Sequence, residues 1–171
     1  MTKIPEKKSI PTRGRTLDHA ARVYDCLEPI LLLGRQEPYN DSIIDALALE
    51  PNHRILDLGC GTGVLTRLIG DRLDAGIGGF CLGIDAAAKM IAVAEKKRAS
   101  ETCRFEVMAA ENLTLADGSF DAVVSSLFFH HVPLDLKQKA LYESFRVLKP
   151  GGHLVIADMH IPTTWMGGLV S

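Results

Sequence analysis

The sequence predicts an α/β protein built on a doubly wound, mostly parallel sheet, and two observations support this fold class. Five continuous apolar runs alternate with stretches of helical periodicity, and the first run leads directly into a glycine-rich turn that opens a helix. Continuous apolar runs are typical of parallel strands covered on both faces. Because alternating strands and helices imply right-handed crossovers, we expect the strand order 3-2-1-4-5.

The expected elements follow one another without long gaps. Strands are predicted at 54–58, 80–84, 103–108, 120–126 and 153–159, with helices between them at 64–73, 86–98 and 134–148. Upstream, apolar residues at helical spacing predict helices at 17–33 and 39–49, separated by breaks at Gly34 and Pro38. We therefore divide the chain into a flexible basic tail (1–15), N-terminal helices that cover the site (16–50) and the sheet domain (51–171).

The glycine-rich turn is the most informative segment, because residues 54–63 read R-I-L-D-L-G-C-G-T-G. Gly59, Gly61 and Gly63 carry no β-carbon, so the backbone can turn sharply and lie against a ligand. The next helix is expected to begin at Val64 with Thr62 as its cap, and its N-terminal N–H groups favour an anionic ligand group. On its own, such a turn can also be a tight strand-to-helix connection.

Two carboxylates near this turn indicate which cofactor it binds. Asp85 ends the second strand about twenty residues on, where a carboxylate binds ribose hydroxyls, and it can also cap the next helix. Asp57 precedes the turn, and the third glycine comes one position earlier than in the dinucleotide pattern G-x-G-x-x-G. Since Asp57 repels a pyrophosphate and attracts an ammonium or sulfonium group, S-adenosylmethionine fits better than a dinucleotide.

These segments resemble the class I S-adenosylmethionine-dependent methyltransferases. D-L-G-C-G-T-G at 57–63 is similar to the first motif of that family, and further motifs follow in its order: D-A-A-A-K-M-I at 85–91, G-S-F-D-A-V-V at 118–124, F-H-H-V at 129–132 and R-V-L-K-P-G-G at 146–152. The resemblance is closest to the small-molecule branch that includes ubiquinone and menaquinone biosynthesis enzymes. It implies a Rossmann-like fold, S-adenosylmethionine as methyl donor and a small-molecule acceptor.

The resemblance also implies a set of cofactor-binding residues that are spread along the chain. They are Tyr24, Asp57, Gly59, Cys60, Gly61, Gly63, Asp85, Ala86, Met90, Ala110, Glu111 and Ser126.

The chain departs from that branch of the family at two places. Where the branch usually reads G-D-A-E, residues 108–111 read M-A-A-E, so Ala109 stands at the position of the Asp that holds the adenine amino group. Adenine is then expected to be held by the other groups of this region: the backbone of Ala110 and Glu111, the side chains of Ala86 and Leu113, and the Asn112 amide. The family's C-terminal antiparallel strands are missing from this chain, so we expect a truncated form or a natural short form.

Histidines after the fourth strand are the candidate catalytic residues. His130 and His131 follow this strand at the carboxyl edge, where open α/β sheets bind ligands, and either can act as the base that deprotonates an acceptor. Asp158 and His160 follow the fifth strand at the same edge and are further candidates. The alternative for each is to cap or pack a turn. Methyl transfer itself depends mainly on in-line alignment and exclusion of water.

Composition limits the partners and the compartment. The net charge is −2 and the only basic cluster lies in the tail, which disfavours nucleic acid as a partner. No apolar run reaches the ~18 residues of a membrane span, and no secretory signal is recognisable, so we expect a cytoplasmic protein. Cys26, Cys60, Cys81 and Cys103 form no C-x-x-C pair. Buried thiols and no metal site are therefore expected, with a catalytic cysteine as the alternative.

Two other functions stay open, and so do two ways of covering the fifth strand. A non-catalytic S-adenosylmethionine-binding or interaction module would bind the cofactor without turnover. A nicotinamide-dependent oxidoreductase is disfavoured by the loop spacing and by Asp57. The fifth strand is expected to be a bare apolar edge, which either pairs with a second copy to form a homodimer or is covered by two further strands of a longer parent chain.

Overall fold

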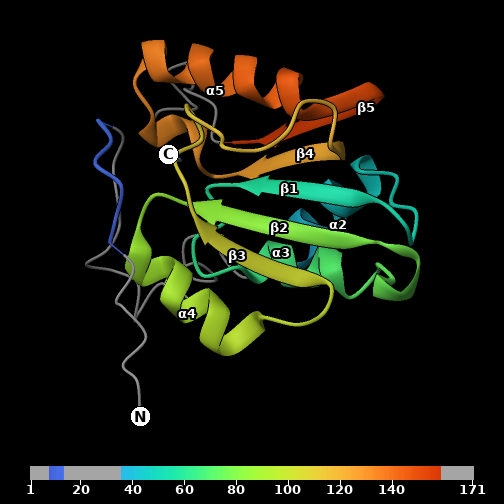
Figure 1. Cartoon of the computed structure of the whole chain (residues 1–171). Coiled ribbons are helices and arrows are strands. Elements are labelled where there is room, and N and C mark those ends of the chain that lie inside the picture. The colour runs from blue at the N-terminus through green and yellow to red at the C-terminus, as the bar shows by residue number, and fades with distance from the viewer. Residues whose placement is uncertain (1–7, 14–35, 159–171) are drawn as a thin grey trace, which may run out of the picture.

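The computed structural model describes residues 8–13 and 36–158, which contain a parallel sheet covered by helices on both faces (Figure 1). The sheet has five strands in the order β3-β2-β1-β4-β5, so the predicted fold class and strand order are confirmed. The strands are β1 (Arg54–Leu58), β2 (Phe80–Asp85), β3 (Cys103–Val107), β4 (Phe120–Ser126) and β5 (Leu148–Ala157). The helices are α2 (Gln36–Ala46), α3 (Val64–Gly70), α4 (Ala88–Arg98) and α5 (Leu134–Val147), with short 3-10 helices at Ala75–Ile77 and Phe129–His131.

Within the described ranges, no helix is long and apolar enough to cross a membrane.

Each face of the sheet has its own apolar core, because alternate side chains of a strand point to opposite faces. Leu56 of β1 packs on one face in a cluster that includes Val147 of α5. Its neighbour Ile55 packs on the other face with Ile44 of α2 and Ile69 of α3. In Figure 1, α2 and α3 accordingly lie behind the sheet, while α5 lies beside β4 and β5.

The starts of α2 and β5 differ from the sequence predictions. α2 begins at Gln36 and contains Pro38 in its first turn, so Pro38 is not the predicted break. Proline is tolerated there because the first N–H groups of a helix have no intrahelical acceptor. β5 begins at Leu148, five residues before the predicted start, because the segment K-P-G-G enters the sheet through an irregular register opposite Phe120 and Ala122. The helix predicted at 17–33 lies outside the described residues.

All five strands run in the same direction, so their carboxyl ends meet at one edge of the sheet (Figure 1). Residues 8–13, drawn in blue, lie beside that edge. The Ile10 N–H donates to the Ala86 carbonyl at 2.9 Å, and the Ser9 hydroxyl accepts from the Ala88 N–H at 3.0 Å. This part of the predicted tail is therefore docked on the sheet domain.

Candidate active site

The glycine-rich turn between β1 and α3 is held by backbone hydrogen bonds to β2. The N–H groups of Gly59 and Cys60 both donate to one β2 carbonyl at 2.9 Å. Gly59, Gly61 and Gly63 have φ angles of 71°, 55° and 83°, in the left-handed region that favours glycine. Gly63 is the N-cap of α3 and no side chain caps this end, so the capping role predicted for Thr62 is wrong, although the helix begins at the predicted residue.

Asp85, at the end of β2, joins two turns of the main chain. One carboxylate oxygen accepts from the Gly61 N–H at 3.1 Å and the other from the Ala87 N–H at 2.8 Å. α4 begins only at Ala88, and its N-cap has no side-chain hydrogen bond, so the predicted capping of this helix by Asp85 is wrong. The carboxylate is thus fixed between the glycine turn and the segment that leads into α4.

Asp57 is buried beneath the glycine turn, with only 1% of its surface exposed. Its carboxylate accepts from the Thr66 hydroxyl at 2.6 Å. Cys60 lies close enough to both carboxylates to feel their charge: burial raises the pKa of its thiol most, and Asp57 and Asp85 raise it further. A raised pKa keeps the thiol protonated, which disfavours the nucleophilic cysteine that the sequence left as an alternative.

A cavity opens beside the glycine turn at the carboxyl edge of the sheet. The predicted site residues that line it are Asp57, Gly59, Cys60, Gly61, Asp85, Ala86, Met90, Ala110, Ser126 and His131. Gly63, Glu111 and His130 are not part of its wall, and Tyr24 lies outside the described residues. The structure therefore brings most of the predicted residues together around one cavity.

Sequence reasoning missed other residues that line the same cavity, including Thr12, Asn40, Val64, Leu65, Met108, Leu127, Phe128 and Val132. Asn40 is a buried polar residue of α2. Its neighbour Tyr39 donates to the Ala157 carbonyl at 3.0 Å, and its hydroxyl lies 3.1 Å from the Ser126 hydroxyl. In the sequence, the only indication that α2 contributes to the cavity was the pair Tyr39 and Asn40, which falls in a helix expected to cover the site.

The turn after β4 distinguishes the two candidate histidines. Asp158 accepts from the His130 backbone N–H at 2.9 Å and pairs with the His130 ring Nδ1 at 2.6 Å. His131 lines the cavity, and its ring centroid lies 3.7 Å from that of His130. The same turn contains Leu127 with a φ of 50°, which is uncommon for a residue other than glycine. His130 is thus tied to Asp158, while His131 reaches the cavity; His160 lies outside the described residues.

Residues 8–13 also contribute to the wall of the cavity, through Thr12. Thr12 lines it, and its hydroxyl donates to the Glu111 carboxylate at 2.7 Å. Arg13 forms an ion pair with Asp135 near the start of α5. Glu111, predicted as a cofactor-binding residue, therefore bonds to the N-terminal segment in this structure.

The open space at Gly61 and the two carboxylates beside the cavity are compatible with S-adenosylmethionine. A Cβ added to Gly61 would meet no atom within 4 Å, so this glycine leaves room for a ligand. A Cβ on Gly59 would lie 2.3 Å from the Phe128 ring, so this glycine is required for packing instead. Carboxylates at Asp57 and Asp85 suit an ammonium or sulfonium group and a ribose, respectively.

Comparison with known sequences assigns this architecture to a family. Residues 56–156 match the family described as Methyltransferase domain. Demethylmenaquinone methyltransferase from Beutenbergia cavernae is 36% identical over 146 residues, which are 85% of this chain and 57% of that protein. Ubiquinone/menaquinone biosynthesis C-methyltransferase UbiE from Geotalea daltonii is 31% identical over 149 residues, which are 85% of this chain and 62% of that protein. The chain thus spans 57–62% of the length of these two relatives.

Solved structures agree with this assignment. The S-adenosylmethionine dependent methyltransferase from Mesorhizobium loti superposes with a TM-score of 0.60 at 29% identity, over 71% of this chain and 54% of that one. The YcgJ protein from Bacillus subtilis superposes with a TM-score of 0.67 at 28% identity, over 75% of this chain and 53% of that one. The fold and the matched motifs define a methyltransferase domain. The chain belongs to the S-adenosylmethionine-dependent methyltransferases, as its motifs predicted.

Proposed function

We propose that this chain carries the cofactor site of an enzyme that transfers a methyl group from S-adenosylmethionine to a small-molecule acceptor. The observation that carries the proposal is the convergence of the glycine turn, Asp57 and Asp85 on one cavity. When bound there, S-adenosylmethionine supplies an electrophilic methyl carbon on a positively charged sulfur. The protein's task is then to orient donor and acceptor in line and to exclude water.

The residues around the cavity divide this task. Asp57 attracts the ammonium group of the cofactor, and Asp85 accepts hydrogen bonds from its ribose hydroxyls. The backbone at Gly61 lies against the ligand, because no Cβ intervenes. Ala86, Met90 and Ala110 provide apolar surface for adenine on the side of β2 and β3.

The acceptor is proposed to be a hydroxylated aromatic ring of the quinol type. The support comes from the relatives named for demethylmenaquinone and for ubiquinone/menaquinone C-methylation. When a ring hydroxyl loses its proton, the electron pair becomes available on a ring carbon. That carbon bonds to the methyl carbon as the carbon–sulfur bond breaks and its electrons stay on sulfur. The proton lost from the ring carbon then restores the hydroxyl, and the proton taken by the base passes to solvent.

His131 is proposed as the base that takes the hydroxyl proton, because it lines the cavity beside the β4 end. A histidine within reach of the acceptor is the commonest group for this role. His130 is proposed as a positioning residue: its two contacts with Asp158 hold the turn, and its ring lies against that of His131.

The test combines binding and turnover on the chain. Calorimetry is expected to show binding of S-adenosylmethionine and S-adenosylhomocysteine, and methyl-labelled donor is expected to transfer label to a short-chain demethylmenaquinol. A His131→Gln variant should bind the donor normally and transfer slowly. Binding with no transfer to any quinol, phenol or amine acceptor would instead identify a non-catalytic module, and tighter binding of NAD would contradict the proposal altogether.

A further inference from the structure

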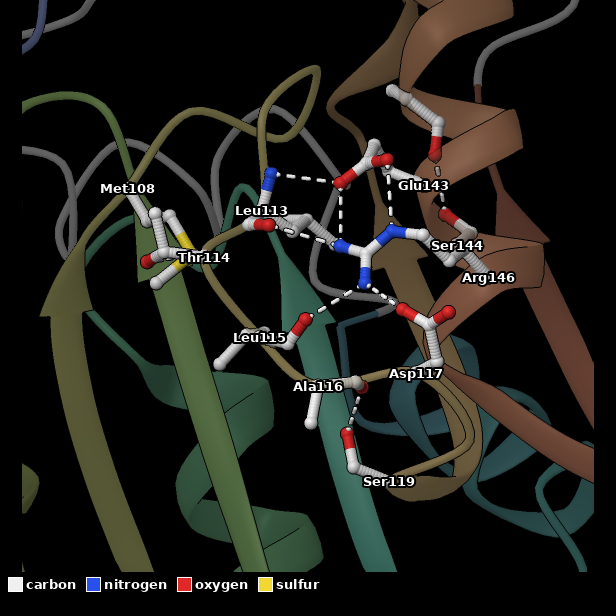
Figure 2. Close-up of polar contacts among 11 residues, drawn as sticks. Met108, Leu113, Thr114, Leu115, Ala116, Asp117, Ser119, Glu143, Ser144 and Arg146 are labelled. Atoms are coloured by element: carbon white, nitrogen blue, oxygen red, sulfur yellow. Dashed lines mark hydrogen bonds and ion pairs between the residues drawn. The ribbon is translucent and has the colours of Figure 1, made fainter.

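The loop between β3 and β4 lies on the proposed adenine side of the cavity and is tied to α5 by two side chains, Arg146 and Glu143. Ala110 of this loop lines the cavity, and Leu113 beside it is buried. Arg146 lies in the last turn of α5 and belongs to the motif R-V-L-K-P-G-G, to which the proposed function gives no role. Figure 2 shows its guanidinium pointing from the helix into the loop, between Leu113, Leu115 and Asp117.

Each of the five N–H bonds of this guanidinium has an acceptor. Nε and Nη2 donate to the two carboxylate oxygens of Glu143 at 3.0 and 2.7 Å. Nη2 also donates to the Leu113 carbonyl at 2.9 Å, while Nη1 donates to the Leu115 carbonyl at 2.8 Å and to the Asp117 carboxylate at 2.5 Å. A planar fork of five donors is unique to arginine, and a lysine ammonium at this position cannot reach these acceptors together.

Glu143 strengthens the same attachment from the helix. Its carboxylate accepts from the Leu113 N–H at 3.0 Å, so the main chain at Leu113 is held through both its N–H and its carbonyl. Arg146 and Glu143 are 22% and 15% exposed, whereas Asp117 is 79% exposed. Because an exposed ion pair contributes little, the attachment depends on Glu143 and on the two carbonyls rather than on Asp117.

The loop is therefore held on both sides of the residues that would face adenine. Before them, the Met108 N–H donates to the Asp85 carbonyl at 3.1 Å. Between the two attachments, the Asn112 N–H donates to the Ala109 carbonyl at 3.1 Å and closes a turn. Arg146 and Glu143 hold the far side at Leu113 (Figure 2). With alanine at 109 and 110, and with Asn112 exposed and not part of the cavity wall, recognition of the adenine edge falls to main-chain groups, which select a ligand only if they are held in position.

We propose that Arg146 is a positioning residue that sets how tightly and how selectively the site holds adenine. This inference rests on the proposed function, because it requires the cofactor to lie in the cavity. Arg146 itself is not part of the cavity wall. It acts by holding the 108–113 segment, so its removal should loosen the adenine end of the ligand while leaving the contacts to Asp57 and Asp85 in place.

The test compares Arg146→Lys with Arg67→Lys, a matched control in which the charge is also kept. Arg67 pairs with Asp71 on the exposed side of α3, at 2.7 Å, with both side chains more than 40% exposed. Calorimetry would measure the affinity of each variant for S-adenosylhomocysteine and for S-inosylhomocysteine, which differs only in the edge of the base. Circular dichroism would give the thermal midpoint of each variant.

Arg146→Lys is expected to weaken S-adenosylhomocysteine binding by about tenfold, because the main-chain groups of the released loop would lose about one hydrogen bond to the base. The ratio of the affinity for S-adenosylhomocysteine to the affinity for S-inosylhomocysteine should fall, because the inosine base makes fewer of these contacts and so loses less. Arg67→Lys should leave both affinities and their ratio unchanged. Glu143→Gln, which keeps the arginine, should lower the ratio in the same direction.

The results distinguish a positioning role for Arg146 from a merely structural one. A lower thermal midpoint with an unchanged affinity ratio in both Arg146→Lys and Glu143→Gln would make Arg146 merely structural and overturn the inference. If Arg146→Lys does not fold, the ratio in Glu143→Gln decides alone. Failure of the unmodified chain to bind S-adenosylhomocysteine would overturn the proposed function, which is a separate result from a failure in the variants alone.

Discussion

The two halves of the cavity are built in different ways. On the proposed donor half, between β1 and β2, the main chain makes the site: the turn at 59–63 bonds to a β2 carbonyl and has three positive φ angles. On the proposed acceptor half, at the ends of β4 and β5, side chains make the site. Tyr39 contacts Ser126, which lies 87 positions away in the sequence, and His130 contacts Asp158, which lies 28 positions away. Backbone geometry leaves a local motif in the sequence, whereas side-chain contacts between distant segments leave none.

If the donor half depends on its backbone, substitution of its glycines should produce the largest effects, and these should differ between positions. A Cβ on Gly63 would lie 2.5 Å from the Phe105 ring, and the φ there is 83°. We expect Gly63→Ala to lower the free energy of unfolding by roughly 3 kcal/mol, from overpacking and backbone strain together. Urea unfolding would measure this loss.

Gly61→Ala is the matched control, since a Cβ there would meet nothing within 4 Å. We expect it to lose only about 1 kcal/mol of stability from its left-handed backbone. Its methyl group would project into the cavity, so cofactor affinity should fall instead. Equal loss of stability in the two variants would contradict the distinction between a packing glycine and a ligand-facing glycine.

Substitutions in the acceptor half should lower the rate of turnover and leave the affinity for the donor nearly unchanged. We expect His131→Gln to lower kcat by about a hundredfold, within the usual range for removal of a general base, with little change in affinity for S-adenosylhomocysteine. His130→Gln should have a smaller effect, because that residue acts through the turn. Steady-state kinetics with the quinol acceptor would measure both. A larger effect of His130→Gln would reverse the assignment of the two histidines.

Most of the donor half was predictable from the sequence, and the reasons are physical. The apolar runs and their alternation with helices predicted the strand order, and the glycine spacing predicted the start of α3 at Val64. The errors concern side chains at helix ends: Thr62 does not cap α3, and Asp85 bonds to the turns beside it instead of capping α4. Capping depends on one rotamer and one dihedral angle, which composition and spacing do not specify.

The acceptor half was predictable only as a set of candidates. Position after a strand places His130 and His131 at the right edge of the sheet, but it gives no rotation of either ring. Which of them faces the cavity depends on Asp158, which lies 28 positions away and binds His130. The contribution of α2 was hidden for the same reason, since the role of Tyr39 exists only once β4 and β5 are side by side.

Acid should weaken the attachment of the adenine-side loop. Hydrogen bonds from Arg146 lower the pKa of Glu143 in the folded chain. A carboxylate with a lowered folded pKa adds stability above its unfolded pKa of about 4.3, and this stability is lost as the pH falls through the folded value. Glu143→Gln should therefore cost on the order of 1 kcal/mol at neutral pH and nearly nothing at low pH. Urea unfolding of both proteins across the acid range would check this; a constant difference would contradict it.

The smallest expected effect concerns β5, which pairs with β4 on one side and forms an end of the sheet in the described part of the chain. Ile156 of this strand is 43% exposed. An exposed apolar edge strand favours pairing with a second copy, and a lysine discourages it. We expect light scattering to show self-association that Ile156→Lys reduces. A monodisperse monomer at high concentration would contradict the predicted homodimer.

Binding of the cofactor at Asp85 can be tested directly by calorimetry with S-adenosylhomocysteine. Asp85→Ala should weaken binding at least tenfold, because the ribose loses hydrogen bonds to a charged acceptor. Asp71→Ala, which removes an exposed carboxylate on the far end of α3, should leave the affinity unchanged. Unchanged affinity in Asp85→Ala, or tighter binding of NAD than of S-adenosylmethionine by the unmodified chain, would contradict the assignment of this site.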